Sequence, residues 1–268
     1  MRSRTPFAVA ALVATLVALP PVAAPAPVIV YTTKTVERHD PACRPSRADA
    51  FSCSHILFEY PVIERAQTPA AAAAINRAVL DFLLTSVGEP RKYASIDAAL
   101  DAFMRAYQDS KQQGSLPTAF WEERTVAILY QSPAIVSVQF DLSFFFGGLH
   151  PQYAATFVSF NATAGTRITL DDVLVAGYRP RLTRIAENEF RAERGITPGM
   201  TLHDAGYIFF KNDTFALTDN FWIGPQGVTF FYNAYDIAPY SMGTTELLLT
   251  YREIRELIRP DGLLQPMR

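Results

Sequence analysis

His150 is the residue of this chain whose local setting best suits chemistry. It follows Gly147 and Gly148, which allow the backbone to turn sharply, and Pro151 fixes the backbone after it. An imidazole at the rim of a sheet can face a ligand or act as a general base. The same ring can instead satisfy backbone groups within a tight turn between two strands. The sequence leaves both interpretations open.

Hydrolase chemistry has little further support in the chain. A nucleophilic hydrolase needs a Ser, Cys or Thr beside a histidine and an orienting carboxylate, and the chain has no G-x-S-x-G nucleophile elbow. Glycosidase chemistry would need two carboxylates at a fixed separation, which the sequence does not define. The candidates are Asp171, Asp172, Glu122, Glu123, Asp213, Asp219 and Asp236. Because negative charge is favourable at a helix N-terminus, Asp171 and Asp172 need no catalytic role. We expect no catalytic residue, no cofactor and no metal.

An aromatic segment from Tyr232 to Tyr240 is the second candidate surface. Its sequence, YNAYDIAPY, is typical of a strand that leaves a sheet and enters an ordered loop. Tyrosine rings beside polar side chains can stack on sugars or anchor a protein partner, since they offer a rigid apolar face and a hydroxyl. The alternative is that Tyr235 and Tyr240 pack the loop onto the core. The predicted ligand contacts are His150, Tyr153, Tyr235, Asp236 and Tyr240.

The N-terminal segment predicts export. Arg2 and Arg4 precede an uncharged apolar run from Phe7 to Leu19, a length typical of a signal peptide and short for a membrane span. Small residues over 22–26 could supply a cleavage site. An uncleaved anchor is the alternative, because the apolar run can extend to Ile29. The expected location is therefore periplasmic or extracellular, either free or anchored by the N-terminal segment.

Cysteine usage agrees with export. Cys43 and Cys53 form an even pair separated by a short stretch, which favours one disulfide. A metal site that adds His39 and His55 is an alternative, but it lacks the Cys-x-x-Cys spacing of common zinc sites. Two free buried thiols are another alternative.

Composition excludes nucleic acid as an expected partner. The chain has 268 residues, with 24 Lys and Arg against 26 Asp and Glu, so it lacks the basic excess that phosphate binding requires. Aromatic residues make up 12% of the chain, which suits β-structure with buried or ligand-facing rings. The length allows one large domain or two small ones.

The first part of the chain has the pattern of a sheet with two helices. From β-branched and aromatic alternation, strands are expected over residues 28–36, 54–63, 125–130, 135–144 and 153–161. Apolar residues at three- and four-residue spacing predict an amphipathic helix from Pro69 and a second one after Ser95, its expected N-cap. Gly114 and Pro117 are expected to end the second helix, and Gly165 suits the turn after the last strand.

The C-terminal part is expected to add a smaller strand-rich region. The predicted elements are a short helix to Leu174 behind the N-cap Thr169, a charged helix over 185–193, strands over 209–217, 222–232 and 246–251, and a short helix over 252–258. The turn from Gly224 to Gly227 interrupts the second of these strands. Together the elements predict an α+β fold of antiparallel sheets with helices packed on one face.

Two longer stretches resemble a known bacterial domain. They are GGLHPQYAATFVSFNATAGTRITLDDVL, from Gly147 to Leu174, and FFYNAYDIAPYSMGTTELLLTYREI, from Phe230 to Ile254. Their order, with FALTDN between them, resembles the extracytoplasmic domain shared by lysozyme-sensing anti-sigma factors of the RsiV type and the accessory region of deacetylases of the PdaC type. The resemblance divides the chain into a signal or anchor (1–26), a PdaC-accessory-like region (27–163), an RsiV-like region (164–260) and a flexible tail (261–268).

This resemblance implies a binding module. Its deacetylase members carry their activity in a separate catalytic domain, whose metal-ligand signature is not reproduced by His39, His55, His150 and His203. RsiV captures a sigma factor with a cytosolic segment, whereas only Met1 to Pro6 precede the apolar run, so no sigma factor is expected as a partner.

The leading hypothesis is a non-catalytic exported module that binds lysozyme, another secreted protein or peptidoglycan. One alternative is a small cell-envelope hydrolase or esterase that uses His150 and a carboxylate such as Asp236. Another is a purely structural envelope protein.

Overall fold

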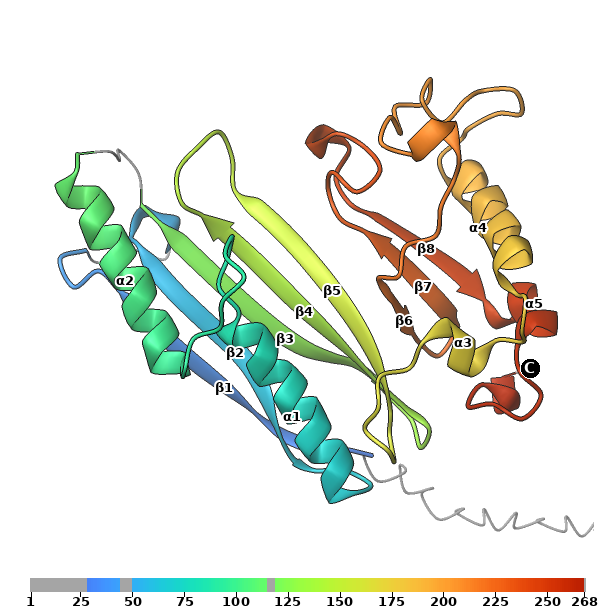
Figure 1. The fold of residues 1–268 in the computed structure, drawn as a ribbon, viewed down its shortest axis with the longest axis horizontal. Helices are drawn as coiled ribbons and strands as arrows, with labels where there is room; N and C mark the ends of the chain where they lie inside the picture. The colour runs from blue at the N-terminus through green and yellow to red at the C-terminus, as the bar shows by residue number, and fades with distance from the viewer. Residues whose placement is uncertain (1–27, 44–49, 115–118, 268) are drawn as a thin grey trace, which may run out of the picture.

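The computed structural model describes residues 28–43, 50–114 and 119–267. The predicted signal or anchor segment, as well as Pro117 and Arg268, lies outside these ranges. Within them the chain forms two sheets, each with helices against one face, which confirms the α+β prediction (Figure 1). Among the helices of these ranges, none is both long and apolar enough to cross a membrane.

The first sheet has five strands in the order β1-β2-β3-β4-β5. In chain order the elements of this part are β1 (Val30–His39), β2 (His55–Arg65), α1 (Pro69–Leu84), α2 (Ile96–Gln112), β3 (Trp121–Gln131), β4 (Ile135–Phe145) and β5 (Gln152–Asn161). Antiparallel pairing was predicted throughout, but β2 and β3 are parallel. The reason is that α1 and α2 form a crossover that returns the chain to the end of the sheet from which β2 started.

Both predicted helices of this part begin at the expected residues. Thr68 caps α1 by accepting the Ala71 N–H at 3.1 Å, and Ser95 caps α2 by accepting the Ala98 N–H at 3.1 Å. Their apolar stripes are buried against one face of the first sheet. Gly165, in the turn after β5, has φ of +72°, and a Cβ there would lie 2.7 Å from the α1 backbone. Glycine is therefore required where this turn meets α1.

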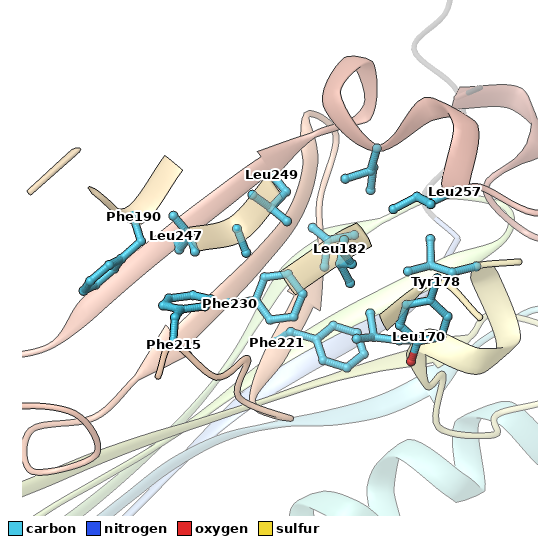
Figure 2. Close-up of a cluster of buried hydrophobic side chains, with 14 of the residues drawn as sticks. Leu170, Tyr178, Leu182, Phe190, Phe215, Phe221, Phe230, Leu247, Leu249 and Leu257 are labelled. Carbon is cyan, nitrogen blue, oxygen red and sulfur yellow. The ribbon is translucent and has the colours of Figure 1, made fainter. Parts of the chain in front are cut away.

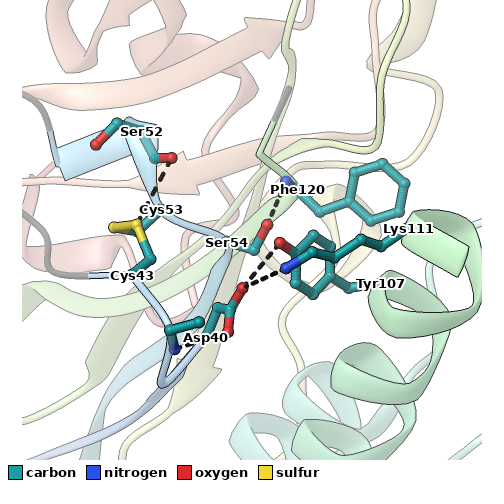
Figure 3. Close-up of polar contacts among 9 residues, drawn as sticks. Asp40, Cys43, Ser52, Cys53, Ser54, Tyr107, Lys111 and Phe120 are labelled. Carbon is teal, nitrogen blue, oxygen red and sulfur yellow. Dashed lines mark hydrogen bonds and ion pairs between the residues drawn. A yellow bond between two sulfur atoms is a disulfide. The ribbon is translucent and has the colours of Figure 1, made fainter. Parts of the chain in front are cut away.

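The Cys43–Cys53 disulfide is present, as the sequence predicted, and it closes the corner between β1 and β2 (Figure 3). Next to it, the buried carboxylate of Asp40 accepts hydrogen bonds from the Tyr107 hydroxyl at 2.9 Å and the Ala42 N–H at 3.0 Å. The hydrogen bond from the Ala42 backbone is the largest of the effects that lower the pKa of Asp40. The contacts of Asp40 tie the disulfide corner to α2.

Replacing both cysteines by serine is expected to lower the free energy of unfolding by about 3 kcal/mol, because the bridge closes a loop with a sequence separation of 10 residues. Urea denaturation of the oxidised protein and of the Cys43→Ser/Cys53→Ser variant measures the effect. The wild-type protein in reductant is the control, and it should unfold at the midpoint of the variant. Equal midpoints for the oxidised protein and the variant would contradict this prediction.

The second sheet has three antiparallel strands in the order β6-β7-β8. The elements of this part are α3 (Leu170–Val173), α4 (Arg179–Glu193), β6 (Phe221–Ile223), β7 (Gly227–Tyr232), β8 (Thr245–Thr250) and α5 (Tyr251–Ile254). Leu182 and Phe190 of α4 lie in one buried cluster with Phe230 and Leu247 of the sheet (Figure 2). Leu264, from the segment predicted as a flexible tail, is buried in the same cluster.

Two predicted elements of this part differ in the structure. The strand over 209–217 is wrong: a 3-10 turn covers Lys211–Asp213, and Asn212 has φ of 55°. The aromatic residues that suggested a strand, Phe210 and Phe215, instead pack on Phe190. The helix expected at 185 begins six residues earlier, since Pro180 is accommodated in its first turn.

Buried polar contacts join the two sheets. The Ser137 hydroxyl donates to the Ile223 carbonyl at 2.7 Å, and the Ser159 hydroxyl accepts the Ile223 N–H at 3.0 Å. Ser137 and Ser159 lie opposite each other on β4 and β5, with their hydroxyl oxygens 2.8 Å apart. Because both serines are fully buried, these bonds fix how β6 is placed against the first sheet.

Candidate functional site

Two loops from different sheets meet at one end of the molecule. The first connects β4 to β5 and carries His150; the second follows β7 and carries Tyr235 and Tyr240. The His150 and Tyr240 rings are stacked, with centroids 3.9 Å apart and planes inclined by 21°. The Tyr235 ring lies 5.7 Å from that of Tyr240. We call His150, Tyr235 and Tyr240, together with the neighbouring Leu149, the ring cluster.

Backbone geometry positions both loops. Gly147 and Gly148 have φ of 90° and 115°, which confirms the sharp turn expected before His150. Tyr235 has φ of 72°, a conformation that is uncommon for a residue with a side chain. The Asp236 carboxylate supports this conformation by accepting the Asn233 N–H at 2.7 Å.

Both ring nitrogens of His150 have partners. Nδ1 lies 2.8 Å from the Pro151 carbonyl oxygen, so it donates to that group. In the neutral ring Nε2 then accepts from the Tyr235 hydroxyl, 3.3 Å away. The basic nitrogen therefore faces a phenol, and the Asp236 carboxylate is used within its own loop. This arrangement gives no histidine–carboxylate pair of the kind that an esterase mechanism needs.

Tyr153 makes its side-chain hydrogen bond outside the ring cluster. Its hydroxyl donates to Asp141 Oδ1 at 2.8 Å, and both residues lie on the face of the first sheet across β4 and β5. Burial and the adjacent Asp141 carboxylate raise the pKa of Tyr153 well above its ordinary value. Of the predicted residues, the structure thus brings together His150, Tyr235 and Tyr240. Tyr153 is hydrogen-bonded to Asp141, and Asp236 to the Asn233 N–H.

Amides from two segments of the second sheet, Asn220 before β6 and Asn233 after β7, pair with β5. The Asn233 Oδ1 accepts the Ala155 N–H at 2.7 Å, and the Asn220 Oδ1 accepts the Phe157 N–H at 2.8 Å. The Ala155 carbonyl accepts from both amides. These bonds provide partners for backbone groups of β5, the edge strand of the first sheet. The bonds of Asn233 also fix the loop that carries Tyr235. Neither asparagine stands out in the sequence, where the only signal is their position beside aromatic strands.

The ring cluster is exposed to solvent. Leu149 is fully exposed at 102% of its reference area, and Tyr235 and Tyr240 are exposed to 48% and 37%. The exposed rings of Tyr235 and Tyr240 come from one loop and the fully exposed Leu149 from the other, beside His150 in the chain. Leu149 is not among the predicted ligand contacts, although a leucine between glycine and histidine in a turn is itself a signal.

The candidate metal site at the cysteines is not formed. Cys43 and Cys53 are bonded to each other, and the described residues contain no group of three or more His, Cys, Asp or Glu side chains that could hold a metal ion. His55 Nδ1 donates to the Cys53 carbonyl at 3.0 Å, and its Nε2 lies 3.0 Å from Glu123 Oε1. The hydrogen bond to Glu123 raises the pKa of His55, and burial opposes it.

These features define a two-sheet α+β domain with an exposed aromatic surface. Residues 171–252 match a family model described as a protein of unknown function, DUF3298. The chain is similar in fold to a member of that family from Bacteroides fragilis, with a TM-score of 0.72, 18% identity, and coverage of 90% of this chain and 98% of that one. A DUF3298 protein from Pseudomonas aeruginosa PAO1 gives a TM-score of 0.64 at 21% identity, covering 87% of this chain and 95% of that one. No curated protein matches this chain.

Proposed function

We propose that this chain is a non-catalytic, exported binding domain that contacts a secreted protein through the ring cluster. The observation that carries the proposal is the contact of the exposed Tyr235 and Tyr240 rings with each other and of Tyr240 with His150, which follows the fully exposed Leu149 in the chain. Tyrosines are enriched among the residues that dominate binding energy at protein interfaces. Export is supported by the disulfide and by the apolar N-terminal run.

A protein partner is favoured over a glycan by the character of the surface. Sugars stack on flat rings but need hydrogen-bond partners for their hydroxyls. Here the hydroxyls of Tyr235 and Tyr240 already face His150 and the Pro151 carbonyl. The fully exposed Leu149 can be buried in an apolar pocket of a protein. Lysozyme is the first candidate, because the resemblance to the RsiV type implies it.

Titration of the oxidised full chain with lysozyme by calorimetry tests the proposal. Saturable binding is expected. The Tyr240→Ala and Leu149→Ala variants should each weaken it at least about tenfold, as is typical of central interface residues. Tyr31→Ala is the matched control, because Tyr31 on β1 is exposed to 39% and lies outside the ring cluster. Its affinity should stay within about twofold of the wild type.

Other outcomes separate the alternatives. Binding of peptidoglycan fragments, but not lysozyme, that is lost in Tyr240→Ala would make the ligand a glycan. Turnover of an acetylated or glycosidic substrate that disappears in His150→Ala would overturn the non-catalytic assignment. Binding of neither ligand, together with reduced thermal stability in every loop variant, would indicate a structural protein.

A further inference from the structure

A pocket of about 380 Å³ lies on the second sheet, beside the turn that joins β6 to β7. Trp222, Thr229 and Leu248 line it from three neighbouring strands, and Thr229 is paired with each of the other two. In the chain these residues alternate with residues of the second core, so their side chains lie on the face turned away from that core. No member of the ring cluster is among the described lining residues, so the pocket is distinct from the surface assigned above.

The Trp222 ring gives the pocket an aromatic wall that is held in place. Gly224 makes room for the ring, because a Cβ at this glycine would lie 2.5 Å from Cζ3 of the indole. The ring also packs against the buried cluster of Ala155, Phe157 and Phe231. Since these contacts fix the ring before any ligand arrives, binding to it costs little conformational entropy.

Thr229 supplies a hydroxyl that has no partner. The residue is only 6% exposed, and its side chain forms no hydrogen bond within the described part of the chain. The hydroxyl is not enclosed, and it opens onto the pocket that Thr229 lines. An incoming donor can therefore bond to an oxygen that the strand already holds next to Trp222.

The charge of the lining is negative. Glu193 and Glu246 line the pocket from exposed positions, and neither forms an ion pair with another described residue. The described lining residues include no lysine, arginine or histidine. Glu193 belongs to a wider group of carboxylates, since burial and then the charges of Glu253 and Glu193 raise the pKa of Glu189. The pocket therefore repels an anion and attracts a cation.

The aromatic wall and the acceptors together select a guanidinium among cations. A guanidinium is planar, stacks on an indole ring and carries five N–H donors and no acceptor. The pocket offers matching acceptors in the carboxylates of Glu193 and Glu246, the Thr229 hydroxyl and the Gln226 amide oxygen. A neutral sugar could also stack on Trp222, but it would leave both carboxylates without a counter-charge.

We propose that this pocket binds an arginine side chain of a peptide or protein. The guanidinium stacks on Trp222 and donates to Glu246 and Thr229, and the methylene stem packs on Leu248. This site does not depend on the function proposed for the ring cluster.

NMR titration of the ¹⁵N-labelled full chain with N-acetylargininamide tests the proposal. The chain has 2 tryptophans and so gives two indole N–H signals, which Trp222→Phe assigns. The Trp222 signal should shift saturably at millimolar concentrations. The Trp121 signal should not shift, because Trp121 is 7% exposed and lies on the first sheet. N-acetylcitrullinamide has nearly the same shape without the charge, so it should bind at least about tenfold more weakly.

Removal of the two charges locates the binding. Glu193→Gln/Glu246→Gln should lower the affinity for N-acetylargininamide at least about tenfold. Glu59→Gln/Glu64→Gln is the matched control, because it makes the same change of net charge at exposed positions of β2. Its affinity should stay within about twofold of the wild type, and thermal midpoints of both variants verify folding.

Three results would overturn the proposal: no saturable shift of the Trp222 signal, equal affinity for N-acetylcitrullinamide, or unchanged affinity in Glu193→Gln/Glu246→Gln. Tighter binding of free arginine than of N-acetylargininamide would exclude a peptide source, and tighter binding of N-acetylglucosamine would make the ligand a glycan. Tyr240→Ala should leave N-acetylargininamide binding unchanged. Failure of the ring cluster to bind lysozyme is therefore distinguishable from failure of this pocket to bind arginine.

Discussion

Replacing Arg124 by methionine is expected to lower the free energy of unfolding by about 3–5 kcal/mol at neutral pH, the usual effect of removing one partner from a buried ion pair. Arg124 is 2% exposed, and its guanidinium lies over the rings of Phe58 and Phe82. It donates to Glu122 and to the carbonyl of Phe82 near the end of α1. The substitution keeps an apolar stem but leaves the buried carboxylate without its counter-charge.

The loss should depend on pH. The pKa of Glu122 in the folded protein is raised above its ordinary value of 4.5. Between that value and the folded pKa, the folded protein therefore retains a proton that the unfolded chain has released. The contribution of Glu122 to stability is therefore full below that ordinary value and is lost as pH rises through the folded pKa. Without Arg124 the folded pKa rises further. Arg124→Met should then be less destabilising at about pH 5 than at about pH 8.

Urea denaturation at both pH values measures this effect. The double variant Glu122→Leu/Arg124→Met should recover most of the lost stability, because apolar side chains then replace the whole pair. Arg181→Met is the control: it removes an exposed ion pair with Glu256 and should leave the midpoint nearly unchanged. If the single and double variants are equally destabilised, the unpaired carboxylate is not the cause.

Truncating Phe190 to alanine is expected to lower the free energy of unfolding by about 3–5 kcal/mol, because it leaves a cavity in the second core. The Phe190 side chain is fully buried, and its centroid lies 4.7 Å from that of Tyr207 and 5.3 Å from that of Phe215. Each of these rings comes from a different segment, so the core cannot close over the cavity without moving several of them. Figure 2 shows Phe190 and Phe215 within this cluster.

Phe209→Ala is the matched control for this core. Phe209 lies beside Phe210 in the chain but is 46% exposed, so its truncation should change the free energy of unfolding by less than about 0.5 kcal/mol. Urea denaturation of the two variants gives both values. A similar loss in both would contradict the assignment of Phe190 to the centre of the core.

Local features of the fold could be predicted because they depend on a few neighbouring residues. The caps Thr169 and Ser95, the hairpin between β3 and β4, and the turn at Gly165 follow from side-chain hydrogen bonds, alternation and backbone freedom within a short stretch. The 209–217 segment was predicted wrongly, because its aromatic residues serve packing between segments and not a strand ladder. The parallel pairing of β2 with β3 also escaped prediction, since alternation does not specify strand direction.

The candidate site likewise has a part that residue types predict and a part that only tertiary packing determines. Residue types alone singled out His150, Tyr235 and Tyr240, because a histidine between a Gly-Gly pair and a proline and a tyrosine-rich loop are unusual in a short stretch of sequence. Their contact could not be predicted, because it joins residues 85 positions apart through two separate sheets. The buried Ser137 and Ser159 fix the placement of those sheets, and Asn233 fixes the loop. Tertiary packing likewise buried Glu122 and Arg124 together inside an apolar layer, where alternation along β3 alone gave no reason to expect a charge.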